Sequence, residues 1–442
     1  EQGRGVEKDE FEACEWFRKA AEQGDRDACY KMGYYVSHGV GVAMFGQRAA
    51  EWYLAAARRG HLNAQNNLGT LFLDGELVQR DLKQAVFWYQ AAADAGLPIA
   101  QHNLAYVHQN GLGVETNVAK AAELYLLAAE GGYASARYTV AEAFYYGRLG
   151  FERDYAAAVE WYRTAAEQEH AAAAFSLGWC FSRGLGVEED DAEGFAWFQR
   201  AADLGYHAAF YQLGVCFNRG YGVAEDPAKA VAFFELAAEG GTLDAMNDLG
   251  WALDKGRGVE IDPARAAFWY RRAADGGNAR GRNNLGVCLV KGTGVEIDLE
   301  QAFQQFSLAA EQGDSDALYN LGWCRENGSG VERDVEEAIE WYVRAGEAGH
   351  ADGHNKAAVL LSKEDSSDAE RTRAFGLFLR AAENGHVSAA NSVGYRYEKG
   401  NGVEPNMEKA IQWYRVSAEG GNAEAQYNMA ICNRFGTGVE TN

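Results

Sequence analysis

Apolar residues recur along this chain in two alternating patterns, each spaced like one face of an α-helix. The first reads Ala-x-x-Trp-Tyr-x-x-Ala-Ala-x-x-Gly and is called here the Trp-Tyr helix. The second carries Ala-x-x-x-Leu-Gly, as in Ala64 to Gly69 and Ala317 to Gly322, and is called the Leu-Gly helix. Two amphipathic helices of about 14 residues cannot bury their apolar stripes alone. The pattern therefore predicts an all-α protein in which helix pairs stack on one another.

A glycine-containing loop follows each pair at a spacing of 36 residues, with one slip to 37. Gly-x-Gly-Val begins at Gly3, Gly39, Gly111, Gly184, Gly220, Gly256, Gly292, Gly328, Gly400 and Gly436. The same spacing places a variant loop at Gly75, a loop with one extra residue at Gly147 and a loop without glycines at Glu364. A fixed period of this size predicts an α/α superhelical solenoid of about 12 helix pairs, hence about 24 helices. We expect it to run as one continuous domain through residues 1–442.

Short polar residues that cap helix N-termini precede the Trp-Tyr helices in register. They are Asp9, Asp81, Asn117, Asp154, Asp190, Asp226, Asp262, Asp298, Asp334 and Asn406. Pro227 and Pro263 follow two of them, at the first helical position, where a missing N–H is harmless. The second aromatic of the Trp-Tyr helix recurs in every repeat, and we assign it to packing: Phe17, Tyr53, Tyr89, Tyr125, Tyr162, Phe198, Phe234, Tyr270, Phe306, Tyr342, Phe378 and Tyr414.

Net charge and cysteine content limit the classes of partner and the cellular compartment that we expect. A formal charge of -23 disfavours nucleic acid or an anionic membrane as the main partner, because both are negatively charged. No run of about 18 apolar residues exists, so we expect no membrane insertion. Five cysteines share one position in the repeat, where they should pack as small apolar groups: Cys180, Cys216, Cys288, Cys324 and Cys432. We expect a cytoplasmic or other reducing compartment, although Asn327-Gly328-Ser329 forms a lone glycosylation sequon.

Taken together, Ala-x-x-x-Leu-Gly, Gly-x-Gly-Val, the capping residue and the Trp-Tyr pattern resemble the Sel1-like repeat, a relative of the tetratricopeptide repeat with a longer loop inside the repeat. The resemblance extends over essentially the whole chain. It implies binding rather than chemistry, because members of that family act as adaptors and scaffolds in protein complexes. It also implies that the Leu-Gly helices line the concave side of the solenoid. Some secreted members carry a disulfide in every repeat, which the cysteine spacing here does not match.

Residue combinations that could carry chemistry are better explained by structure. The Gly-x-Gly copies lack the Gly-Lys-Ser/Thr or the third glycine of a nucleotide-binding loop, so we interpret them as turns. His350 and His354 have a zinc-like spacing, but His350 lies at the inter-helix turn, where histidines recur at His61, His170 and His386. Acidic residues after the loops are expected to stabilise helix N-termini and to form an acidic ridge: Glu7, Glu115, Glu188, Glu260, Glu296 and Glu332. We expect no metal, no cofactor and no enzyme activity.

The Leu-Gly helices offer the face most suited to a partner. The residue after the glycine is aromatic in alternate repeats, at Tyr34, Tyr106, Trp179, Trp251, Trp323 and Tyr395, and in the others is Thr70, Glu142, Val215, Val287, Val359 or Ile431. One helical turn earlier lie asparagine and tyrosine side chains that suit an extended peptide backbone. We predict partner binding by Trp179, Trp251, Trp323, Tyr211, Asn247, Asn283, Tyr319 and Asn355. The alternative is that the aromatics only fill the space between neighbouring helices.

The leading hypothesis is a protein-interaction scaffold that holds a protein or peptide segment in a concave groove. The alternatives are a structural subunit of a large assembly and an enzyme of unrecognised type. The chain begins at Glu1 and ends at Asn442 within the loop register, so we expect a fragment, or ends that meet further repeats or subunits. Ser362 to Asp368 replaces the loop glycines but keeps the spacing, which predicts a looser turn and a candidate hinge or modification site.

Overall fold

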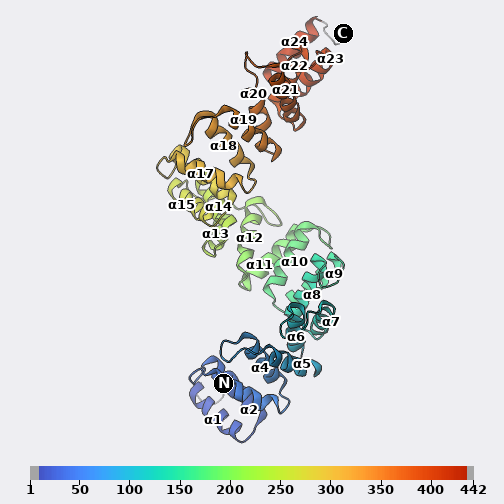
Figure 1. Ribbon diagram of the computed structural model, residues 1–442, viewed down its shortest axis with the longest axis vertical. Coiled ribbons are helices and arrows are strands. Elements are labelled where there is room, and N and C mark those ends of the chain that lie inside the picture. Colours follow the sequence, from blue (N-terminus) through green and yellow to red (C-terminus); the bar gives the residue numbers. More distant parts are fainter. Residues whose placement is uncertain (1–8, 436–442) are drawn as a thin grey trace. The chain divides into compact units, whose positions relative to one another are not determined.

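The computed structural model describes residues 9–435, and in that range the chain is helical without β-strands (Figure 1). It divides into two compact units, Glu1–Glu225 and Asp226–Asn442, and each is described by itself. The first unit contains α1 (Glu10–Glu22), α2 (Arg26–His38), α3 (Gly46–Ala57), α4 (Leu62–Asp74), α5 (Leu82–Asp94), α6 (Pro98–Asn110), α7 (Val118–Glu130), α8 (Ala134–Tyr146), α9 (Tyr155–Ala166), α10 (Ala171–Arg183), α11 (Asp191–Asp203) and α12 (His207–Arg219).

The second unit continues the same pattern. It contains α13 (Pro227–Glu239), α14 (Leu243–Lys255), α15 (Pro263–Asp275), α16 (Ala279–Lys291), α17 (Leu299–Ala310), α18 (Ser315–Asn327), α19 (Val335–Glu347), α20 (Gly353–Leu360), α21 (Asp368–Glu383), α22 (Val387–Lys399), α23 (Met407–Glu419) and α24 (Ala423–Phe435). Odd-numbered helices are the Trp-Tyr helices and even-numbered helices are the Leu-Gly helices. The 24 helices of the described range confirm the predicted all-α repeat solenoid. The prediction of a single continuous domain stays a prediction.

Helix N-termini form where the capping residues predict them. All ten Asp and Asn side chains named above accept a hydrogen bond from a backbone N–H in the first turn of the helix that follows. Pro227 and Pro263 occupy the first turns of α13 and α15. These caps satisfy N–H groups that a helix leaves without an internal partner. They fix the start of each Trp-Tyr helix relative to the preceding loop.

The Gly-x-Gly loop has two separate geometric requirements, seen clearly at Gly111 and Gly113. Gly111 ends α6 in the left-handed conformation, with φ of 67°, which favours glycine. Gly113 also has a positive φ, and a Cβ added there would lie 2.5 Å from the carbonyl oxygen of Leu82, at the start of α5. The second glycine therefore lets the loop pack directly on the backbone of the preceding Trp-Tyr helix. The interpretation of this motif as a turn is confirmed.

The glycine of the Leu-Gly helix makes room for the second aromatic ring of the Trp-Tyr helix that follows it. A Cβ added to Gly394 on α22 would lie 2.6 Å from Cδ1 of Tyr414 on α23. The same close approach joins Gly33 to Tyr53, Gly69 to Tyr89, Gly178 to Phe198, Gly250 to Tyr270, Gly286 to Phe306 and Gly322 to Tyr342. Apart from Phe17, the second aromatics are at most 3% exposed. Their assignment to packing is confirmed, and the two helix patterns are complementary halves of one contact.

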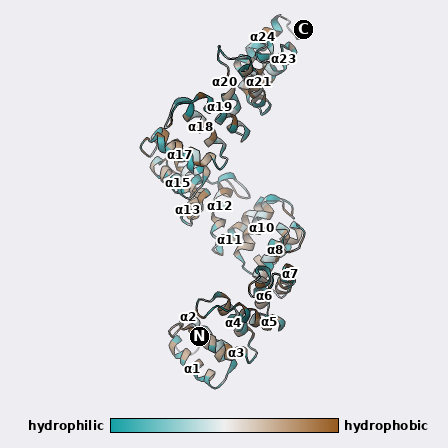
Figure 2. Cartoon of the chain, viewed as in Figure 1, coloured by the Kyte–Doolittle hydropathy of each residue, from teal (hydrophilic) through white to brown (hydrophobic). Residues whose placement is uncertain are grey.

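Alanines and cysteines complete the interior. The Ala-Ala pairs of the Trp-Tyr helices are largely buried, which permits close helix contact, and Figure 2 shows apolar and polar residues side by side along the helices. All seven cysteines are buried free thiols, which confirms the packing prediction for the five at the shared repeat position. No helix in residues 9–435 combines the length and hydropathy of a membrane span.

The loop without glycines changes the lengths of its two flanking helices. α20 has 8 residues and α21 has 16, against 13 in most other helices. α21 begins early because Ser367 and Glu370 form a reciprocal capping box. The core register holds, since Phe378 is buried in the same position as Tyr342 and Tyr414. Whether this loop is looser than the others stays a prediction. Gly3, Glu7, Gly436 and the two chain ends lie outside the described residues.

Candidate functional site

Several aromatic side chains that follow the Leu-Gly glycine reach solvent. In the second unit, Trp251 on α14 is 40% exposed and Tyr395 on α22 is 50% exposed. In the first unit, Tyr34 on α2 and Tyr106 on α6 are exposed to a similar extent. Large aromatic rings in a repeat protein have ample opportunity for burial, so rings left open at one repeated position are candidate contact points.

Trp179 and Trp323 are half-buried rather than open. The Trp179 ring on α10 makes edge contacts with Phe175 and Phe198, and the Arg183 guanidinium lies 5.3 Å from its centroid. Trp323 on α18 packs against the core of α19 and the helices that follow it. These two rings have a clear packing role, whereas Trp251 has the larger open surface. Trp179 lies in the first unit and the other two in the second, and the predicted partner binding by these three residues stays a prediction.

The alternation between aromatic and smaller residues after the glycine has a structural cause in part of the chain. Where the residue is polar, it forms a hydrogen bond with the buried tyrosine hydroxyl of the following Trp-Tyr helix. The Thr70 hydroxyl lies 3.0 Å from the Tyr89 hydroxyl, and Glu142 accepts a hydrogen bond from Tyr162. Where the residue is aromatic, a polar side chain one turn later in the same helix bonds to the tyrosine hydroxyl instead. The hydroxyl of Ser37 contacts that of Tyr53, and the hydroxyls of Tyr125, Tyr342 and Tyr414 donate to Gln109, Glu326 and Glu398, respectively. Alternation in size is therefore not by itself a sign of a groove.

Asparagines on the Leu-Gly helices tie successive repeats together. Asn247 and Asn283 are 4% and 7% exposed, and each carboxamide oxygen accepts from an asparagine of the next repeat. Asn284 donates to Asn247 at 2.9 Å and Asn320 donates to Asn283 at 2.8 Å. Equivalent bonds join Asn103 to Asn66 and Asn428 to Asn391. The immediate role of Asn247 and Asn283 is thus to connect neighbouring repeats, a role that the sequence interpretation missed.

The other predicted site residues are partly accessible. Tyr319 on α18 is half-buried and stacks on His350, with ring centroids 4.2 Å apart. Tyr211 on α12 and Asn355 on α20 are also half-buried. The structure separates His350 from His354, because His354 is buried against Gly346 while His350 sits at the turn. Within residues 9–435, no three His, Cys, Asp or Glu side chains cluster as metal ligands would.

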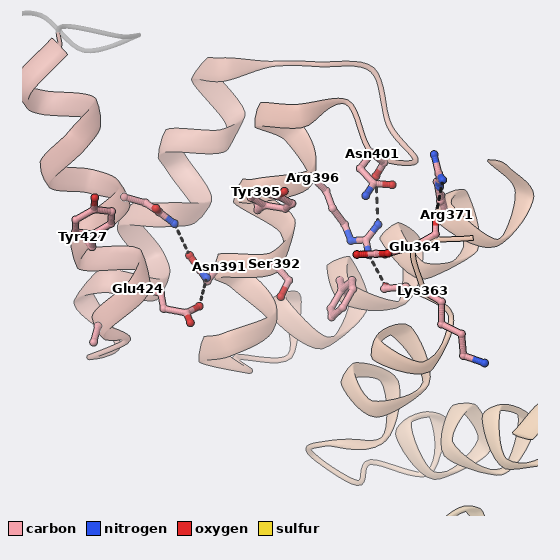
Figure 3. Close-up of a pocket in the computed structure, with 14 residues that line it drawn as sticks. Lys363, Glu364, Arg371, Asn391, Ser392, Tyr395, Arg396, Asn401, Glu424 and Tyr427 are labelled. Atoms are coloured by element: carbon pink, nitrogen blue, oxygen red, sulfur yellow. Dashed lines mark hydrogen bonds between the residues drawn. The ribbon is translucent and has the colours of Figure 1, made fainter. Parts of the chain in front are cut away.

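A pocket of about 930 Å³ opens on the Leu-Gly face of the second unit, between α22, α24 and the loop before α21 (Figure 3). The exposed ring of Tyr395 lines it, as do Lys363 and Glu364 of the loop that lacks glycines. Arg396 also lines the pocket, although it is only 5% exposed. Burial lowers the pKa of its guanidinium, an effect that nearby Arg371 reinforces. The pocket thus combines an aromatic ring with a desolvated positive charge.

Comparison with known proteins agrees with this repeat geometry. The family model described as Sel1 repeat matches residues 1–25, 26–61, 62–97, 98–133, 134–170, 171–206, 207–242, 243–278, 279–314, 315–350, 356–386, 387–422 and 423–442. The chain belongs to the Sel1 repeat family. The matched segments pair each Leu-Gly helix with the Trp-Tyr helix that follows it, the same two helices that the glycine-to-ring contact joins.

Two solved Sel1 repeat structures are similar to this chain. One is a protective antigen present in uropathogenic Escherichia coli strains, with 32% identity and a TM-score of 0.83, covering 96% of this chain and 90% of that one. The other is a Sel1 repeat protein from Oxalobacter formigenes, with 30% identity and a TM-score of 0.50, covering 55% of this chain and 96% of that one. No curated protein sequence matches.

The pocket residues of this Sel1 repeat protein escaped the sequence interpretation. Arg396 occupies the repeat position that holds Cys324 two repeats earlier and Cys432 one repeat later. An arginine at a repeat position that is otherwise apolar could have identified Arg396 as a candidate functional residue from the sequence. The neighbouring loop change at Glu364 is visible in the sequence, but its proximity to Arg396 depends on how the repeats stack.

Proposed function

We propose that this Sel1 repeat protein is an interaction scaffold that binds a protein or peptide segment on its Leu-Gly helices, with Trp251 as one anchor. Sel1 repeats are commonly protein-interaction scaffolds. The observation that carries the proposal is the exposure of aromatic rings at one repeated position of these helices, above all Trp251 at 40%. Tryptophan and tyrosine concentrate binding energy at protein interfaces.

The surroundings of Trp251 favour a rigid binding surface. The preceding residue, Gly250, packs closely on the ring of Tyr270, which fixes the position of α14 against α15. On the adjacent turn of α14, Asn247 accepts the hydrogen bond from Asn284 of α16. An anchor held in place by its own fold loses little conformational entropy on binding. The same contacts that build the solenoid thus preorganise the proposed interface.

The test compares Trp251→Ala with a matched control, Phe268→Ala. Phe268 is a large aromatic in the same unit, 54% exposed, but it lies on α15, a Trp-Tyr helix. Tagged wild-type protein and both variants are used to capture partners from a lysate of the source organism, followed by mass spectrometry and binding measurements. We expect Trp251→Ala to weaken capture of a specific partner by about 30-fold, and Phe268→Ala to leave it unchanged.

Unchanged helical content and unchanged unfolding temperature establish that both variants fold. A partner retained equally by wild type and by Trp251→Ala would count against the proposed anchor. A partner lost equally from both variants would show that the loss is not specific to the Leu-Gly helices and would also count against the proposed anchor.

A further inference from the structure

Arg396 stands at a repeat position that is otherwise apolar in the Leu-Gly helices. The same position holds Cys180, Cys216, Cys288, Cys324 and Cys432, all buried. Arg396 is buried too, with 5% of its surface exposed. An arginine side chain stays charged in proteins, so this repeat carries a positive charge where its neighbours carry a small apolar group.

The guanidinium of Arg396 contacts only neutral groups. It donates to the hydroxyl of Ser362 and to the carbonyl oxygen of Asn401, the latter at 3.4 Å, and it lies 4.8 Å from the centroid of the Phe378 ring. In the described part of the chain, no carboxylate lies within ion-pairing distance of it. Burying a charge without an opposite charge is unfavourable, so such a group favours an anion that reaches it.

The pocket of about 930 Å³ gives an anion access to this charge (Figure 3). Lys363 is exposed at its edge, and half-buried Arg371 lines the same wall, where it donates to the backbone oxygen of Glu364. Two carboxylates also line the pocket. Glu424 accepts a hydrogen bond from Asn391 at 3.2 Å, whereas Glu364 is exposed and forms no ion pair with Arg396. Three cationic side chains and two carboxylates therefore line this pocket, on a chain of net charge -23; of the three cations, Arg371 also lies 4.0 Å from the carboxylate of Asp368, outside the lining.

We infer that the Arg396 pocket binds an anionic group of a partner's peptide segment, a carboxylate or a phosphate, with Lys363 as a second cation. The inference rests on the proposed function, because Tyr395 beside Arg396 is one of the exposed aromatics of the Leu-Gly face. It adds the chemistry of the partner: an anionic residue next to an apolar one. Guanidinium groups suit carboxylates and phosphates because they can donate two parallel hydrogen bonds.

The test titrates short peptides into the full chain by calorimetry at low salt. The probes are acetylated, amidated Phe-Gly-Glu, its neutral counterpart Phe-Gly-Gln, the phosphoserine version Phe-Gly-pSer, and inorganic phosphate alone. We expect the Glu or phosphoserine peptide to bind at one site at least tenfold more tightly than the Gln peptide. Equal binding, or no binding, of the Glu, phosphoserine and Gln peptides would overturn the inference. Inorganic phosphate that binds as tightly as the peptides would overturn the assignment to a peptide segment.

Three variants locate the site. Arg396→Cys installs the residue of five other repeats and should reduce binding of the anionic peptides at least tenfold. Lys363→Ala and Glu364→Gln change exposed loop residues, so they should fold even if Arg396→Cys does not. Lys363→Ala should weaken binding, and Glu364→Gln should strengthen it by removing a negative charge from the edge of the pocket. Unchanged affinity in both loop variants, or in a folded Arg396→Cys, would overturn the inference.

The control Phe268→Ala should leave peptide binding unchanged, because Phe268 lies on α15, outside the pocket. The outcome is separable from the test of the scaffold function. If the peptides did not bind but partner capture still depended on Trp251, only the assignment of anion binding to the Arg396 pocket would be rejected. If the anionic peptides bound but partner capture did not depend on Trp251, the proposal that Trp251 is an anchor would be rejected, and the pocket would remain a binding site.

Discussion

Adding one methyl group at Gly394 should destabilise the contact on which the repeat is built. In Gly394→Ala, the new Cβ would lie 2.6 Å from Cδ1 and 2.8 Å from Cε1 of Tyr414, and 3.0 Å from the carbonyl oxygen of Ala410. The ring has little freedom to move away, because Tyr414 is completely buried and its hydroxyl donates to Glu398 at 2.8 Å. The substitution therefore forces α22 and α23 apart.

The magnitude follows from two opposing effects. Overpacking of this kind costs about 1–3 kcal/mol, whereas replacing glycine by alanine inside a helix gains about 1 kcal/mol. Because the buried ring cannot move away, we expect the overpacking to dominate, so that Gly394→Ala lowers the local free energy of unfolding by up to about 2 kcal/mol. Gly376→Ala on α21 is the matched control, since nothing lies within 4 Å of its added Cβ. That variant should be stabilised by about 0.5–1 kcal/mol.

The assay is hydrogen exchange of the α21–α23 amides followed by mass spectrometry, which reports local unfolding and does not assume that a repeat array unfolds in one step. Faster exchange in α22 and α23 of Gly394→Ala, with slower exchange in α21 of Gly376→Ala, is the expected result. If Gly394→Ala exchanged as slowly as the wild-type protein, the glycine would not be required for ring packing, and the physical account of the Leu-Gly pattern would be wrong.

Three further predictions concern buried polar groups. Burial lowers the pKa of His102 from 6.5 to about 4, so below pH 6.5 the unfolded chain binds a proton that the folded chain does not bind. The free energy of unfolding should therefore fall between pH 6.5 and 4, by about 2 kcal/mol at pH 5. In urea titrations, His102→Leu should reduce this dependence on pH. Asn284→Ala leaves the Asn247 carboxamide oxygen without its donor and should cost about 1–2 kcal/mol; a double-mutant cycle with Asn247→Ala that gives no coupling would contradict this. Burial raises the pKa of the Cys324 thiol to about 12, so it should not react with a thiol reagent at pH 8 until the protein unfolds, and rapid labelling of the native protein would disprove the packing assignment.

Much of the fold could be predicted because its determinants are local and repeated. Asp262 caps α15 and Pro263 begins it through interactions within a few residues, so the sequence pattern contains all that is needed. The Ser367–Glu370 capping box is equally local, and its Ser-x-x-Glu spacing is visible in the sequence, but the preserved repeat spacing predicts one turn over Ser362 to Asp368.

Contacts between repeats were harder to predict. The hydrogen bond from Asn320 to Asn283 joins residues 37 apart, one more than the period, and depends on how successive helices stack. Asn283 therefore had the appearance of a partner-binding residue although it is buried. Arg396 was missed for the opposite reason: its repeat position predicted burial, but only the three-dimensional arrangement shows a pocket beside it and no carboxylate within reach.

The most direct test of the scaffold account is the dissociation constant of a purified partner for wild-type protein, Trp251→Ala and Phe268→Ala, measured under one salt condition. The account predicts that Trp251→Ala weakens binding by about 30-fold, or about 2 kcal/mol, while Phe268→Ala binds like the wild type. The two rings are 40% and 54% exposed, so exposure alone would favour a larger effect at Phe268. Equal dissociation constants for all three proteins, with all three folded, would contradict binding through Trp251 on the Leu-Gly face.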